Sequence, residues 1–400
     1  MKSEEKIERF LDELEPFLIL VIICSFVGVV GGALGALFLK TIDVFTAFRT
    51  SFKYLVFAMP IVGLLIVYIN KKYKCAENES EVVNKAMFGE DLPNHTVPSL
   101  FITTCLSHLV GASVGKLEAP IGMGGSIGNY ISNFFGLKSK YRRTVIASGV
   151  SALFGCIFGT PVMGTVFSLE LCYSKDNKKP IFILPVLLSA CFSRFICFAF
   201  GINSFVDRIL YIHHANYGIR DIFFILVLII ICLSFGLIFN YIFDFVKNLF
   251  SKIKNEYIRI IIGSLIMIGA FYLINNTLFL GNDTSLIKKS MVNNHMWYSF
   301  IVKTILTALC ASIGFKGGKI GPAFVVGCCL GILLANFLGI DPIMGACIGS
   351  LCLIGSVSTF YISTIVLGIE IFGFKSIVFY IIIALAIRYF VNNGYIKRNI

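Results

Sequence analysis

Two glycine-rich breaks in the chain, ASVGKLEAPIGMGG at 112–125 and ASIGFKGGKIGP at 311–322, each lead into an apolar segment at a proline. Proline favours the first turn of a helix, where its missing N–H donor costs nothing, so Pro120 and Pro322 predict two helix N-termini. The unpaired amides and the positive dipole end of such a terminus must meet protein, water or an anion. This pattern therefore predicts an anion site between two helices, with Ala119 beside Pro120 at one of them.

A third helix start is expected near 78–80, where Asn78, Glu79 and Ser80 are residue types that cap a helix or favour its first turn. Ordinary capping would account for these residue types by itself. Contact of Asn78 and Ser80 with the anion is the second interpretation, and it requires that this helix also point at the site.

Both breaks belong to an internal repeat. The equivalent segments are NESEVVNKAM at 78–87 and NDTSLIKKSM at 282–291, GASVG at 111–115 and CASIG at 310–314, and VFSLE ending at Glu170 and VLGIE ending at Glu370. The separations between equivalent residues stay between 199 and 204, which chance similarity would rarely produce. We expect two related units, the second inverted if each crosses the membrane an odd number of times, with the substrate site between them.

The composition predicts that lipid surrounds most of these helices. The chain has 400 residues, of which 57% are hydrophobic and 14% are charged, whereas soluble domains carry about 25% charged residues. Several apolar runs approach the roughly 20 residues needed to cross a bilayer, and the shorter ones suggest tilted or broken helices. The 36 glycines indicate close helix packing within one bundle.

The net charge of +12 follows a positive-inside pattern, because Lys and Arg gather in short segments at 70–74, 137–143, 175–179 and 252–254. A specific polyanion site, such as one for nucleic acid, is the weaker interpretation. No cleavable signal is visible, and residues 1–16 predict an N-terminal surface helix in the cytoplasm. The expected divisions are then a first membrane repeat at 17–203, a connecting loop at 204–220 and a second membrane repeat at 221–400.

Enzymatic and metal-binding motifs are not visible in the sequence. The 13 cysteines show no paired metal spacing and fall mostly in apolar segments, where cysteine behaves as a small hydrophobic residue. No Ser/His/Asp, HExxH or P-loop arrangement occurs, so an intramembrane enzyme is the less favoured alternative. We expect neither a cofactor nor a metal.

The same segments resemble the CLC family of chloride and fluoride transporters. GKLEAPIGMGGSIG is similar to the family's GREGP motif and the glycine-rich helix that follows it, and GGKIGPAFVVGCCLG is similar to its second-half GxFxP segment. The resemblance extends from Phe17 to Tyr395. It implies an all-α polytopic membrane protein with a CLC-like fold of two inverted-topology helical repeats and broken intramembrane helices, usually assembled as a homodimer.

The resemblance implies that Glu118 is the gate, a carboxylate that occupies the anion position and leaves when it is protonated or displaced. A carboxylate among helix N-termini mimics an anion, and protonation removes its charge. The alternative is that Glu118 only pairs with Lys116 or caps its own helix. The resemblance also implies that Tyr395 lines the anion site through its hydroxyl, although a tyrosine near the last span is often an interface anchor.

The sequence departs from the family pattern at four places. Leu117 is an apparent insertion before Glu118, and Leu171 stands where the chloride antiporters have an internal proton-transfer acid. Asn78 stands at or near the place of the family's serine motif. The missing acid, the asparagine and the short chain resemble the fluoride-transporting CLC-F branch, which makes fluoride the leading substrate.

The fourth departure is in the second-half motif, where Lys319 and Gly321 replace the Glu and Thr of the fluoride antiporters. A lysine at membrane depth is costly unless it pairs with Glu118, faces an anion or loses its proton. We expect an anion to be the partner of Lys319, with Ile320 and Gly321 also at the site. The alternative is that Lys319 extends its ammonium group to water.

The function expected from sequence is CLC-type transport of a small inorganic anion across the cell membrane, foremost fluoride export, with fluoride/proton antiport gated by Glu118 as one form of it. The alternatives are a passive anion channel and a CLC protein that carries chloride or nitrate. The expected partners are fluoride or chloride, protons in an exchanger, the lipid bilayer and a second copy of the chain.

Overall fold

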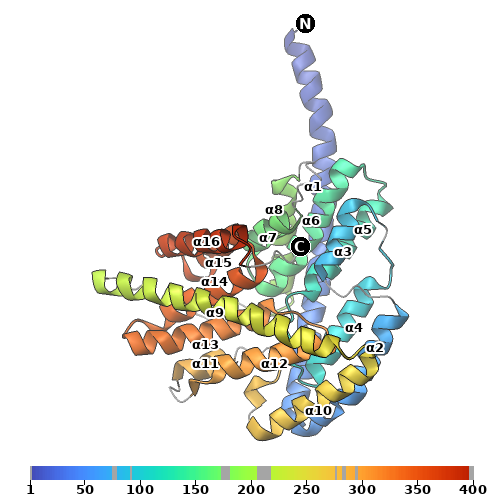
Figure 1. Ribbon diagram of the computed structural model, residues 1–400. Helices are drawn as coiled ribbons and strands as arrows, with labels where there is room; N and C mark the ends of the chain where they lie inside the picture. The colour runs from blue at the N-terminus through green and yellow to red at the C-terminus, as the bar shows by residue number, and fades with distance from the viewer. Residues whose placement is uncertain are drawn as a thin grey trace.

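The computed structural model describes residues 2–73, 79–90, 92–172, 181–204, 218–274, 277–281, 285–292 and 296–395 (Figure 1). Within these ranges only the backbone is described at 2–14, 79–80, 139–140 and 277. All the regular elements in the described part of the chain are helices, and the strand-like contact is limited to one isolated bridge. This agrees with the all-α class expected from the sequence.

The first half of the chain forms the helices α1 (Lys2–Ser51), α2 (Met59–Lys72), α3 (Glu79–Phe88), α4 (Thr96–Leu109), α5 (Ala119–Phe134), α6 (Ser139–Phe158), α7 (Pro161–Cys172) and α8 (Ile183–Ala199). A short 3₁₀ helix, η1 (Lys53–Ala58), precedes α2.

The second half forms α9 (Ile219–Ser251), α10 (Glu256–Ile274), α11 (Ser285–Val292), α12 (Ser299–Ile313), α13 (Ile320–Leu338), α14 (Pro342–Ser358), α15 (Tyr361–Phe372) and α16 (Ile377–Asn392). A 3₁₀ helix, η3 (Thr277–Phe279), precedes α11. The order of helices repeats, so that α3 corresponds to α11, α5 to α13 and α7 to α15, as the internal repeat predicts.

The apolar helices fall into two classes by length. In the described part of the chain, five helical segments are long and apolar enough to cross a membrane: 15–51, 53–72, 219–251, 256–274 and 320–338. Seven further apolar helices have only 10–17 residues. The segment at 320–338 is 78% buried, against 22–39% for the other four, so α13 lies in the core while the others have apolar surface that lipid can cover.

The N-terminal helix differs from the expectation of a separate surface helix at 1–16. α1 runs through Pro16 without a break, and its first part extends alone beyond the bundle (Figure 1). Residues 2–15 are rich in Glu, Lys and Leu, which favour helix, so the single proline does not end it. The second half likewise begins slightly earlier than expected, because α9 starts at Ile219 with Asp221 accepting from the Gly218 amide.

Glycines bring the central helices of each half into backbone contact. A Cβ atom on Gly149 of α6 would lie 2.1 Å from the carbonyl oxygen of Gly124 on α5. The equivalent pair in the second half is Gly349 of α14 and Gly327 of α13, with the same 2.1 Å. A side chain at these positions would force the helices apart, which explains why the sequence places small residues there.

Two contacts show that the halves have opposite orientation. Gly115 and Gly318, one in each glycine-rich break, form an antiparallel bridge in which each amide donates to the other's carbonyl, at 2.8 and 3.2 Å. The C-terminal end of α7 meets the N-terminal end of α15 through Glu170, and the reverse contact is made by Glu370. Equivalent helices are therefore antiparallel, and the inversion expected of the repeat is present.

Candidate functional site

The two glycine-rich breaks bring the N-termini of α5 and α13 together. Glu118 is the N-cap residue of α5, with Pro120 in the first turn, and Lys319 is the N-cap residue of α13. The bridge between Gly115 and Gly318 joins the two breaks just before these helices start. Ala119, Pro120, Ile320, Gly321 and Pro322 are all buried.

Glu118 binds the N-terminus of the opposite helix. Its Oε1 atom accepts a hydrogen bond from the Ile320 amide at 2.7 Å, and its side chain is only 8% exposed. It makes no side-chain capping bond to α5, so the interpretation that Glu118 caps its own helix does not describe this arrangement. A carboxylate therefore occupies the position that an anion at the α13 terminus would take.

Gly318 provides the space for this carboxylate. A Cβ atom at Gly318 would lie 1.6 Å from Cδ of Glu118, so no larger residue fits while the side chain is seated. The acid comes from the first half of the chain, whereas the glycine and the amide come from the second. The site is thus assembled across the interface between the repeats.

Lys319 brings a positive charge to the same place. It is partly buried and lines the same cavity as Glu118. The carboxylates of Glu118 and Asp244 and the ammonium group of Lys247 belong to residues that line this cavity as well. The arrangement can hold either a carboxylate or a small anion near a fixed cation and free backbone amides.

A cavity of about 940 Å³ leads away from the carboxylate. Glu118, Ile121, Gly318, Lys319 and Ile320 are among its lining residues. Residues from α2, α3, α9, α10 and the segment before α13 line the remainder, among them Val67, Asn70, Lys71, Glu81, Asn84, Asp244, Lys247, Ser251, Glu256, Arg259 and Lys316. The cavity thus connects the two helix N-termini with an ionic surface.

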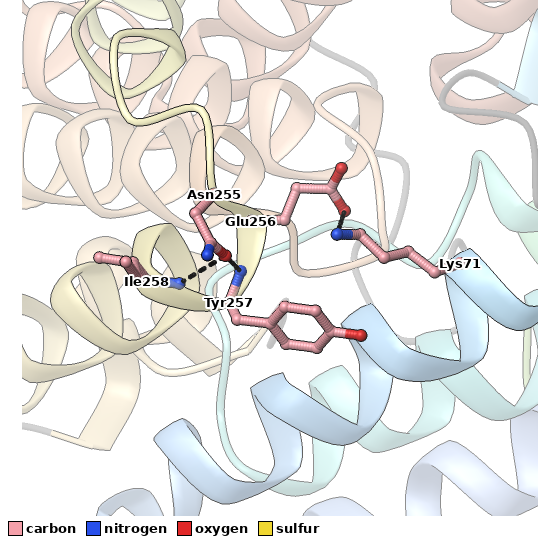
Figure 2. Close-up of polar contacts among 5 residues, drawn as sticks. All are labelled: Lys71, Asn255, Glu256, Tyr257 and Ile258. Carbon is pink, nitrogen blue, oxygen red and sulfur yellow. Dashed lines mark hydrogen bonds and ion pairs between the residues drawn. The ribbon is translucent and has the colours of Figure 1, made fainter.

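Figure 2 shows the contact between α2 and α10 at this surface. The Lys71 Nζ atom lies 3.9 Å from the Glu256 carboxylate and 4.6 Å from the centroid of the Tyr257 ring. Asn255 Oδ1 accepts from the amides of Tyr257 and Ile258 at 3.0 and 3.4 Å, which caps the start of α10. The two contacts of Lys71 join the end of α2 to the start of α10 beside the cavity.

Among the expected anion-binding residues, Tyr395 does not line the cavity. Tyr395 is 67% exposed, its ring contacts Phe390, and its amide donates to the Phe390 carbonyl, so the chain folds back on the end of α16 instead of reaching the cavity. Asn78 lies outside the described residues. Ser80 is in the first turn of α3, where only the backbone is described, although Glu81 and Asn84 of that helix do line the cavity.

Some lining residues were not singled out from the sequence. Phe167 and Phe360, one from each half, line the cavity with ring centroids 5.0 Å apart in an edge-to-face contact. Asp244 and Lys247 also line it, from α9. The chain has 39 phenylalanines, and nothing in the local pattern distinguishes these two. Asp244 could have been predicted to face a cavity, since an acid within a long apolar helix is energetically costly in lipid.

The comparisons with known proteins agree with the geometry. The family model for voltage gated chloride channels matches residues 62–393. A chloride/fluoride channel protein of Pseudomonas syringae pv. tomato is 25% identical over 377 residues, which cover 88% of this chain and 79% of the relative. An H(+)/Cl(-) exchange transporter ClcA of Klebsiella pneumoniae is 24% identical over 230 residues, 55% of this chain and 48% of the relative.

Two solved structures match the fold of this chain over nearly its whole length. The crystal structure of a CLC-type fluoride/proton antiporter matches with a TM-score of 0.84 and 28% identity, covering 96% of this chain and 97% of that chain. A slow cyanobacterial Cl⁻/H⁺ antiporter has a TM-score of 0.80 at 16% identity, with 94% of each chain covered, and this likeness concerns the fold alone. The chain belongs to the voltage gated chloride channel family and is a multi-pass membrane protein of CLC-type anion transport, not an enzyme.

Proposed function

We propose that the chain exports fluoride as a fluoride/proton antiporter, with Glu118 as the gate. The observation that carries this proposal is the hydrogen bond from the Ile320 amide to Oε1 of Glu118, at 2.7 Å. A carboxylate bound to a helix N-terminus competes with a transported anion for the same donors and dipole. The seated form of Glu118 therefore corresponds to a closed site.

In this proposal, protonation of Glu118 couples anion movement to proton movement. A neutral carboxylic acid is held less strongly by the α13 terminus than a carboxylate, because the charged hydrogen bond and the dipole interaction are lost. Fluoride can then take the position at the amides of Ile320 and Gly321, with Ala119 and the two prolines setting the helix ends around it. When Glu118 releases its proton it returns as a carboxylate and displaces the anion, so that one site exchanges anion and proton.

Lys319 supports anion occupancy in this scheme. A desolvated ammonium group near the α13 terminus adds attraction that water would otherwise screen. It stands where the fluoride antiporters carry an acid, so we propose that it raises the affinity for the anion once Glu118 has left. Asn78 and Ser80 remain candidates for a third helix terminus at the site.

Fluoride as the substrate is supported by the relatives. The chloride/fluoride channel protein of Pseudomonas syringae and the CLC-type fluoride/proton antiporter both have names that refer to this ion, and the latter covers nearly all of the chain. Chloride or nitrate transport is the alternative within the same fold. The identities of 25% and 28% leave the choice of anion to experiment.

The cavity would open toward the cytoplasm of the cell, with the protein in the cell membrane. Its lining includes Lys71 at the end of α2 and Ser251 at the end of α9. Both lie at the basic segments 70–74 and 252–254, which the positive-inside pattern assigns to the cytoplasmic side. An anion leaving the cell would then pass the ionic surface before it reaches Glu118.

A passive anion channel is the second candidate function. It is favoured by Lys319 and by Leu171, which is buried on α7 where the chloride antiporters have their internal acid. A permanent positive charge holds an anion without a proton, so a pathway with Lys319 could conduct without exchange.

One experiment separates these functions. The purified protein is placed in liposomes, fluoride, chloride and nitrate efflux are followed with ion-selective electrodes, and external pH is recorded. Stoichiometric proton movement with fluoride efflux is expected. Anion efflux without proton movement would establish a channel, and efflux of chloride or nitrate in preference to fluoride would reject fluoride as the substrate.

We further propose a homodimer with one pathway in each subunit, on the family resemblance. Apolar side chains on α7, α8, α15 and α16, including Phe195, Phe198 and Leu385, are exposed in the single chain and are compatible with this assembly. Light scattering on the detergent-solubilised protein would test it, and a mass of one chain would exclude the dimer.

A further inference from the structure

A second carboxylate besides the gate lines the cavity that contains Lys319. Asp244 lies on α9, a helix that packs against α13, and its exposed side chain lines the same cavity as Lys319. Glu118 and Lys247, which follows Asp244 by about one turn on α9, line this cavity too, so Lys319 shares it with two carboxylates and another ammonium group. One of these carboxylates is thus at the proposed anion site, and the other is on α9.

These two partners differ in what happens to them during transport. In the proposed cycle Glu118 becomes neutral or leaves its seat, whereas Asp244 remains on a long helix at one side of the cavity. Once Glu118 is neutral or has left its seat, Asp244 is the carboxylate of this pair that still carries a negative charge in the cavity of Lys319. A negative charge there weakens the attraction of Lys319 for an incoming anion, because opposite charges near one ion partly cancel.

We propose that Asp244 is the counter-ion of Lys319 and limits the affinity of the site for its anion, so that the anion binds strongly enough to enter but is also released. This inference depends on the proposed anion-binding role of Lys319. The other charged residues that line this cavity, besides Asp244 and Lys319, are Lys71, Glu81, Glu118, Lys247, Glu256, Arg259 and Lys316.

Two substitutions on α9, one that removes a negative charge and one that removes a positive charge, test the sign of the effect on anion affinity. The half-saturating anion concentration is measured from the initial rate of efflux from liposomes, and binding of potassium fluoride and potassium chloride is measured by calorimetry. Asp244→Asn should lower this concentration by about threefold or more, since a unit charge across a wet cavity changes binding by a few-fold. Lys247→Gln should raise it.

Asp221→Asn is the matched control, because it makes the same chemical change on the same helix. Asp221 is in the first turn of α9, 23 residues before Asp244, which corresponds to roughly 35 Å along the helix axis. Its half-saturating concentration should equal that of the unmodified protein. A change as large as that of Asp244→Asn would mean that any loss of charge on α9 has this effect, and would overturn the assignment.

A double-mutant cycle separates this inference from the proposed function. The effect of Asp244→Asn should disappear in a Lys319→Met background, because the carboxylate acts through the lysine. If Asp244→Asn has no effect while Lys319→Met weakens binding, the counter-ion assignment is wrong and the role of Lys319 stands. If the effect of Asp244→Asn persists in the Lys319→Met background, Asp244 acts on the anion directly and the assignment is also wrong. If Lys319→Met leaves binding unchanged, the proposed anion role of Lys319 itself fails.

Discussion

Glu170 and Glu370 each cap the helix that carries the other. Glu370, near the end of α15, accepts from the amides of Val162 and Met163 at the start of α7, at 3.1 and 2.8 Å. Glu170, near the end of α7, accepts from the Ile362 and Ser363 amides at the start of α15, at 3.2 and 2.8 Å, and also from the Ser363 hydroxyl.

This reciprocal pair fastens the two repeats at positions separated by 200 residues. Each carboxylate meets the positive end of a helix dipole, so its hydrogen bonds are of the charged kind. The VFSLE and VLGIE segments are therefore repeated for a structural reason. Glu170 is used as a helix cap, so it does not replace the internal proton-transfer acid that the chloride antiporters have at the position of Leu171.

Glu370→Gln should destabilise the protein by about 1–3 kcal/mol, because a charged acceptor of two backbone amides is replaced by a neutral one. The measurement is unfolding in detergent, followed by the accessibility of the buried cysteines to a thiol reagent. Glu90→Gln, at an exposed position after α3, is the control and should have little effect. Equal stability of the Glu370→Gln and Glu90→Gln variants would contradict the capping role.

Glu118→Gln and Glu118→Ala should both abolish proton-coupled movement, since neither side chain can take up and release a proton. Anion efflux should continue in Glu118→Ala, where no carboxylate competes for the Ile320 amide. The check is simultaneous recording of fluoride efflux and external pH from liposomes. If either variant retained the proton stoichiometry of the unmodified protein, the assignment of the gate would have to be abandoned.

Gly318→Ala should displace the Glu118 carboxylate, because the new methyl group would fall within 1.6 Å of its Cδ atom. Loss of the bond to Ile320 costs the seated form about 1.5–3 kcal/mol, or roughly tenfold or more in its population. Passive anion efflux at neutral pH should rise accordingly. Gly269→Ala is the matched control, since a Cβ atom there meets no atom within 4 Å; an equal rise in that variant would reject the mechanism.

Lys319→Met should weaken anion binding at neutral pH by about tenfold, the equivalent of one charge-assisted hydrogen bond. Methionine keeps much of the apolar length of lysine without its charge, so packing around the α13 terminus is preserved. Calorimetry with potassium fluoride measures the change. Lys316→Met removes a charge from the same cavity three residues earlier, and an effect there as large as that of Lys319→Met would mean that Lys319 has no special place at the site.

The sequence by itself determined the helical class, the membrane environment, the internal repeat and the two helix N-termini at Pro120 and Pro322. These features depend on local or periodic properties: apolar length, the backbone preference of proline, and similarity between segments about 200 residues apart. The glycines that bring α5 to α6 and α13 to α14 were also predictable as contact residues, because small side chains in apolar helices indicate close packing. The break expected after residue 16 was not present, since helix propensity outweighed one proline.

Only the tertiary structure decided which groups meet. The bond between Glu118 and Ile320 joins residues 202 apart, and no local pattern specifies that a carboxylate from one repeat binds the helix terminus of the other. The same holds for Asp244, which lines the cavity of Lys319 from another helix, and for Tyr395, which packs on Phe390 on the surface although the family pattern suggested a place at the site. Side-chain convergence depends on how the inverted repeats pack against each other, and that is a property of the folded chain.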